Sequence, residues 1–122
     1  MYTVAVRQRF DASHALLVAT GPEAAPHTHH YLLELVLEGP RLGPDGYLVD
    51  IDLVKQVMRS LVERYAGRML NDVHELRGLN PSLEHFARLL WTGMSTALAG
   101  MGLSRLRVVL WEDDEAWAAY EG

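Results

Sequence analysis

The hydrophobic periodicity of the chain changes twice along its length, and this constrains the fold more than any other feature. Residues 2–14 and 29–38 alternate in the period-two pattern of half-buried strands. Apolar side chains then recur at helical spacing over residues 53–65 and 86–98. Alternation returns at residues 106–110. The pattern therefore predicts strand, strand, helix, helix and strand, followed by a short tail.

The connecting segments are rich in glycine and proline. Residues 17–27 and 69–79 are expected to be loops. Residues 39–46 contain two Gly-Pro pairs and predict a turn region. A further short strand is expected at residues 47–50.

Both helices carry sequence signals at their ends. Asp50 or Asp52 can cap the first helix, and Gly67 ends it. Pro81 is expected at the first position of the second helix. Together these elements predict an α+β fold, with a four-stranded antiparallel sheet and two helices on one face.

Composition limits the classes of function. With 122 residues, the chain is expected to form one domain over residues 1–122. The net charge of −5 and the lack of a basic run make nucleic acid and anionic membranes poor partners. We expect no membrane span, no secretion signal and a cytoplasmic location. The absence of cysteine excludes disulfides and a cysteine nucleophile.

Three histidines form the strongest candidate for chemistry. His27 and His29 are two residues apart, so on a strand they point to the same face. His14 completes a set of three imidazoles, which suits zinc and leaves a fourth coordination position open, as in catalytic sites. The alternatives are ordinary surface histidines or a tag, although an internal cluster followed by a strand argues against a tag.

Ordered motifs make the chain resemble the 6-pyruvoyl-tetrahydropterin synthase family, which includes the bacterial 6-carboxytetrahydropterin synthases. The resemblance extends over nearly the whole chain. The matching segments are Phe10-x-Ala12-x-His14, His27-x-His29-x-Tyr31, Leu48-Val49-Asp50-Ile51, Leu70-Asn71-Asp72, Leu79-Asn80-Pro81-Ser82-x-Glu84 and Val108-Val109-Leu110-Trp111-Glu112.

This resemblance implies a tunnelling fold, in which subunits join edge to edge into barrels and assemble as homohexamers with active sites between subunits. It implies that zinc, held by His14, His27 and His29, binds the side chain of a reduced pterin. It also implies that Glu112 anchors the pterin ring and that Ser82 replaces a threonine near it. A simple ion pair of Glu112 with Arg105 or Arg107 is disfavoured, because alternation places the arginines on the other strand face.

The catalytic positions depart from the family. The family's cysteine, four residues before the first histidine of H-x-H, corresponds to Glu23, and its Asp-His pair corresponds to Ala66-Gly67. The usual H-G-H-N is altered to His27-Thr28-His29-His30. Some relatives that act on dihydroneopterin for folate synthesis use a glutamate as base, one position nearer the H-x-H, where this chain has Ala24.

Glu23 is therefore a candidate replacement base, and its alternative is a solvated loop carboxylate. Asp72 and His74 are candidates for a substitute proton relay, or are simply exposed. Two functions follow from these residues. One is a zinc-dependent pterin lyase acting on dihydroneopterin or its triphosphate, and the other is a zinc-containing pterin-binding protein with little catalysis.

Overall fold

A computed structural model describes residues 1–18 and 20–122 of the chain. The strands are β1 (Tyr2–His14), β2 (His27–Gly39), β3 (Arg105–Trp111) and β4 (Trp117–Tyr120). The helices are α1 (Ile51–Glu63) and α2 (Leu83–Ala97). Three short 3-10 turns lie in the connections, at Pro22–Ala24, Leu70–Asp72 and His74–Leu76.

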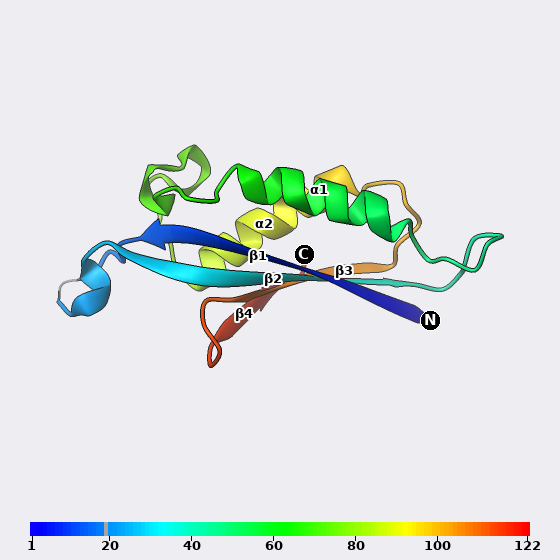
Figure 1. Cartoon of the computed structure of the whole chain (residues 1–122), viewed down its shortest axis with the longest axis horizontal. Coiled ribbons are helices and arrows are strands. Elements are labelled where there is room, and N and C mark those ends of the chain that lie inside the picture. Colours follow the sequence, from blue (N-terminus) through cyan, green and yellow to red (C-terminus); the bar gives the residue numbers. More distant parts are fainter. Residues whose placement is uncertain (19) are drawn as a thin grey trace.

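The four strands form one antiparallel sheet in the order β1-β2-β3-β4. Figure 1 shows both helices on the same side of this sheet, with β4 at the edge away from β1. The α+β class and the layer of two helices on one face of a four-stranded sheet are thus confirmed. Within the described chain, no helix is long and apolar enough to cross a membrane.

The core lies between the sheet and the helices because alternate strand residues share one face. Even-numbered residues of β1 and β3 and odd-numbered residues of β2 point toward the helices. The fully or nearly fully buried members of this face are Val6, Phe10, Ala12, Tyr31, Leu33, Leu35, Leu37, Val108 and Leu110. They pack against a helix surface that buries Val54, Met58, Phe86, Leu90 and Met94.

Two predicted elements differ from the structure. Residues 47–50 are not a strand, and the fourth strand is instead β4, in the segment expected to be a tail. The α2 helix begins at Leu83 rather than at Pro81, because Ser82 is the cap and its hydroxyl accepts a hydrogen bond from the His85 N–H.

The connections show smaller differences. Asp50, rather than Asp52, caps α1 by accepting a hydrogen bond from the Leu53 N–H. That helix ends at Glu63, and the chain reaches Gly67 through further turns. The predicted loop at residues 17–27 includes position 19, which lies outside the described residues, and it contains the short turn Pro22–Ala24.

Candidate metal centre and ligand cavity

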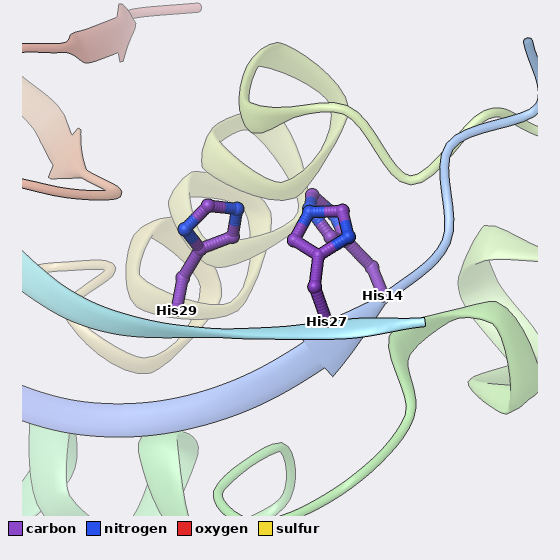
Figure 2. Close-up of side chains that lie close together, drawn as sticks. All are labelled: His14, His27 and His29. Carbon is purple, nitrogen blue, oxygen red and sulfur yellow. The ribbon is translucent and has the colours of Figure 1, made fainter. Parts of the chain in front are cut away.

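The pairing of β1 with β2 brings the three histidines together. His14 lies directly opposite His27, and Ala12 lies opposite His29. One candidate ligand nitrogen from each ring lies within 4.8 Å of the other two, and the ring centroids are 4.5–4.9 Å apart. Figure 2 shows the three rings gathered above the ends of the two strands. A small inward movement would give the spacing of about 3.3 Å expected for nitrogens around tetrahedral zinc.

Backbone carbonyls orient two of the rings. Nδ1 of His14 lies 2.7 Å from the Pro81 carbonyl oxygen, and Nδ1 of His27 lies 2.8 Å from that of Ala25. A carbonyl only accepts, so each Nδ1 must carry the proton and each Nε2 keeps its lone pair. This is the arrangement usual for metal-binding histidines, in which the outer nitrogen is fixed by a hydrogen bond.

His14 is the buried member of the cluster. It is 1% exposed, and its Nε2 is buried without a hydrogen-bond partner in the structure. Burial lowers the pKa of His14, and the neighbouring charges of His27 and His29 add to this, while the hydrogen bond to Pro81 opposes it. The imidazole is therefore neutral near pH 7, which is the form that binds a metal ion.

Two asparagines hold the chain that follows His14. Asn71 forms a double bridge with Ala15: its Oδ1 accepts from the Ala15 N–H, and its Nδ2 donates to the Ala15 carbonyl, both at 2.8 Å. Asn80 Oδ1 accepts from the Leu17 N–H at 2.7 Å. Both residues appear in the sequence motifs, but their partners are far away along the chain, so sequence reasoning did not find this role.

A cavity of about 280 Å³ opens beside the histidines. It contains two of the carboxylates predicted from the sequence, Glu23 and Glu112, next to the three imidazoles. Its lining consists of His14, Leu16, Pro22, Glu23, His27, His29, Glu112 and Asp113.

Glu112 and Glu23 reach the cavity from different sides. The β3 strand ends at Trp111, so Glu112 lies just beyond it, on the same side of the sheet as His29, with a side chain that is 27% exposed. Its Oε2 is 3.7 Å from His29 Nε2, while Arg105 binds Glu38 and Glu121 instead. Glu23 is exposed in the turn that precedes β2.

Asp113 is a lining residue that sequence reasoning missed. Its Oδ1 accepts hydrogen bonds from the backbone N–H groups of Glu115 and Ala116, both at 2.8 Å. These two bonds lower the pKa of Asp113, and the nearby His29 contributes to the same effect. The carboxylate is therefore held ionised at the cavity. An acidic residue two positions before the bonded N–H is a local signal for this turn, but it does not indicate that Asp113 lines the cavity.

Tyr31 adds a second unpaired polar group close to the cluster. Its ring lies 5.6 Å from that of His29, and its hydroxyl is buried without a hydrogen-bond partner in the structure. Burial raises the pKa of Tyr31, and the charge of Glu112 raises it further, so the hydroxyl stays protonated and able to donate.

The altered motif around His29 does not affect this cavity. Thr28 and His30 point to the opposite face of the sheet, where Thr28 contacts Ser13 at 2.8 Å and His30 contacts Asp11 at 2.7 Å. This departure from the family pattern therefore leaves the three-histidine face unchanged.

The other predicted residues lie elsewhere in the subunit. Asp72 and His74 line a separate hollow of about 520 Å³. Ser82 uses its hydroxyl to cap α2. Gly67, which the resemblance aligns with the histidine of the family's Asp-His pair, has φ of +72°, a conformation that glycine adopts without strain. Within one subunit, the three histidines, Glu23 and Glu112 therefore line one cavity. The candidate relay residues Asp72 and His74 line another.

The fold and this cluster define an α+β protein with a candidate metal centre. The family model described as 6-pyruvoyl tetrahydropterin synthase matches residues 3–122, so the chain belongs to that family. The comparison with curated proteins gave no significant match.

Solved structures with the same fold include relatives of low sequence identity. A 6-pyruvoyl tetrahydropterin synthase from Caenorhabditis elegans is 19% identical, with a TM-score of 0.88, and the match covers 99% of this chain and 95% of that one. A Plasmodium vivax synthase, in a form in which a catalytic glutamate is replaced by alanine, is 15% identical, with a TM-score of 0.82 and coverage of 99% and 97%. An uncharacterised protein from Wolinella succinogenes is 15% identical, with a TM-score of 0.81 and coverage of 99% and 98%.

The asparagine bridge makes a testable prediction. Replacing Asn71 with alanine removes both bonds and leaves the partly buried polar groups of Ala15 without partners. We expect the free energy of unfolding to fall by about 1–3 kcal/mol, measured by urea denaturation in zinc-free buffer. Asp72→Ala, a neighbouring exposed change, should cost no more than about 0.5 kcal/mol. Equal losses in the two variants would show that the bridge does not fix this segment.

Proposed function

We propose that this protein is a zinc-dependent pterin lyase that acts on the side chain of dihydroneopterin or of its triphosphate. The observation that carries the proposal is the convergence of three imidazoles, two of them oriented by backbone carbonyls, on a cavity that also contains Glu23 and Glu112. Membership of the synthase family supports a pterin as the ligand.

Zinc fits the residues present. The buried, unpaired Nε2 of His14 needs a partner, and a metal ion would satisfy it. The carbonyls of Pro81 and Ala25 fix the outer nitrogens of His14 and His27, as metal ligands require. Zinc bound there would stabilise negative charge developing on an oxygen of the substrate's side chain.

Glu23 is our candidate for the base that removes a proton from that side chain. It lines the same cavity as the histidines, and the chain has no cysteine to take this role. A carboxylate, with an ordinary pKa of about 4.3, is a weaker base than a thiolate, with about 8.5, so we expect modest rates. The Plasmodium vivax relative with a catalytic glutamate offers a precedent within the fold.

Glu112 is proposed to anchor the pterin ring. The amino group and ring N–H of a pterin form two adjacent donors, which one carboxylate can accept in a bidentate, charge-assisted way. Ser82 would contact the pterin less directly, because its hydroxyl already caps α2.

The second candidate function is zinc-dependent pterin binding with little catalysis. Two observations favour it: Gly67, aligned by the resemblance with the family's histidine, has no side chain that could act as a relay, and Asp72 and His74 line a different hollow. Measured turnover of dihydroneopterin separates the two functions.

We also propose a homo-oligomer, most simply a cytoplasmic hexamer. Each outer strand of the sheet, β1 and β4, is paired on one side only, and such edges favour pairing with another copy. Assembly would allow a neighbouring subunit to contribute residues such as Asp72 and His74 to the cavity.

Zinc binding is tested by the histidines themselves. We expect one zinc per subunit in the wild type and a marked loss in His14→Ala, because a water molecule cannot replace the buried imidazole. His30→Ala is the matched control, since this histidine belongs to the same motif but faces the other side of the sheet. Elemental analysis that finds equal zinc in the two variants would contradict the assignment.

The base is tested by Glu23→Gln. We expect turnover of dihydroneopterin to fall by about 10²- to 10⁴-fold, the usual contribution of a general base, while zinc content and pterin affinity are retained. Glu63→Gln, on the exposed end of α1, should leave turnover unchanged. Activity that survives in Glu23→Gln excludes Glu23 as the base, and a wild type without turnover favours the binding-protein alternative.

The anchor is tested by Glu112→Gln, which keeps the shape of the side chain but replaces one acceptor with a donor. Pterin binding should weaken by about 1–3 kcal/mol, the cost of a mispaired polar group, with zinc content and assembly unchanged. Calorimetry on both proteins measures this difference. Equal affinities would remove Glu112 from the ligand site.

A further inference from the structure

Tyr31 combines a core position with an unpaired polar atom. The residue is 1% exposed, and its hydroxyl is buried with no hydrogen-bond partner among the described residues. Because the core of its own subunit encloses this atom, a neighbouring copy cannot reach it to supply a partner. A phenylalanine would fill the same space without leaving a buried donor unsatisfied, so packing alone does not account for the hydroxyl.

Other aromatic rings fix the direction in which the Tyr31 hydroxyl points. The Tyr31 ring stacks on Phe10, with centroids 5.4 Å apart, and meets Phe86 edge to face at 5.2 Å. On the side of the cavity it meets His29 at 5.6 Å. A ring packed in this way keeps its rotamer, and a donor fixed in advance loses little entropy when it forms a hydrogen bond.

Glu112 provides an acceptor next to this donor. Leu32 and Trp111 form the last pair of the β2–β3 ladder. Tyr31 and Glu112 are the next residues along the two chains, so they lie side by side on one face of the sheet. The negative charge of Glu112 adds to the rise in the pKa of Tyr31, in agreement with this placement. The contact of Glu112 with His29 is 3.7 Å long, which is beyond a hydrogen bond and leaves the carboxylate with lone pairs to offer.

We propose that Tyr31 is a positioning residue, whose hydroxyl donates a hydrogen bond to the Glu112 carboxylate, directly or through one water, when that carboxylate takes up the ligand. This inference rests on the function proposed above and adds a second residue to the anchor of the pterin ring. A carboxylate has enough lone pairs to accept from the ligand and from Tyr31 together. Each of these contacts fixes the plane of the carboxylate for the other, so the contacts strengthen one another.

The variant Tyr31→Phe tests this inference, because it removes the hydroxyl and keeps the ring. Tyr120→Phe is the matched control: the Tyr120 ring also packs against an aromatic side chain, that of Trp91, but Tyr120 is not in the cavity lining. Urea denaturation of the ligand-free protein measures stability. Calorimetric titration of neopterin into the zinc-loaded full chain measures affinity. The double variant Tyr31→Phe/Glu112→Gln, compared with Glu112→Gln alone, shows whether the hydroxyl acts through Glu112.

Tyr31→Phe should bind neopterin roughly tenfold more weakly than the wild type, the usual effect of losing a hydrogen bond to a charged group. Its zinc content should be unchanged and its urea midpoint no lower, because the hydroxyl has no partner in the ligand-free subunit. Tyr120→Phe should bind like the wild type. In the Glu112→Gln background, the loss of the Tyr31 hydroxyl should change affinity by less than about twofold.

The inference is overturned if Tyr31→Phe binds neopterin as tightly as the wild type, or if the loss is equally large in the Glu112→Gln background. A urea midpoint clearly below that of the wild type also overturns it, because the hydroxyl would then have a partner in the free core and a structural role. A wild type that binds no neopterin would instead contradict the proposed function, and the inference with it.

Discussion

The antiparallel pairing of β1 with β2 is the constraint on which the rest of the site depends. Each strand is 13 residues long, and their register places His14 opposite His27 and Ala12 opposite His29. Because side chains alternate between faces, a slip of one residue would turn the histidines of one strand away from those of the other. The apolar residues of the same face, such as Phe10 and Leu33, enforce this register, since a slip would also expose them. Core packing and site geometry are therefore determined together.

The segments that approach the strand ends from the helix side also determine the geometry of the histidine cluster. The Pro81 carbonyl orients His14, and Asn71 and Asn80 hold the residues that follow it. The result is a buried imidazole with one nitrogen satisfied and the other open. An unpaired buried polar atom is costly, so the free protein is less stable than it would be with that nitrogen bound. A metal ion that binds the folded state would recover this cost and stabilise the fold.

Much of this could be predicted from the sequence, because the patterns involved are local. Alternation identified β1, β2 and β3, helical spacing identified α1 and α2, and the two-residue separation of His27 and His29 placed them on one face. The four residues of β4 were missed, since a segment so short carries little periodicity, and residues 47–50 were wrongly expected to be a strand. The asparagine contacts and the place of Asp113 in the cavity depend on residues distant in sequence, which no local pattern reveals.

The face of the sheet on which each residue lies explains which departures from the family affect the cavity. Thr28 and His30 differ from the residues usual in the family's motif, but they lie on the face of the sheet opposite the three histidines. Glu23, in contrast, lines the cavity, and Gly67 provides no side chain where the resemblance aligns the family's histidine. The chain thus brings three histidines together in a candidate metal centre and departs from the family pattern in the groups around them.

X-ray absorption spectroscopy of the zinc-loaded protein tests the central claim most directly, because it counts the ligands of the metal. The account predicts about three imidazole nitrogens at roughly 2.0–2.1 Å together with one oxygen from water or ligand, the pattern of an open tetrahedral site. A spectrum with at most one imidazole, or with a shell of six oxygens, would show that His14, His27 and His29 do not form the metal centre.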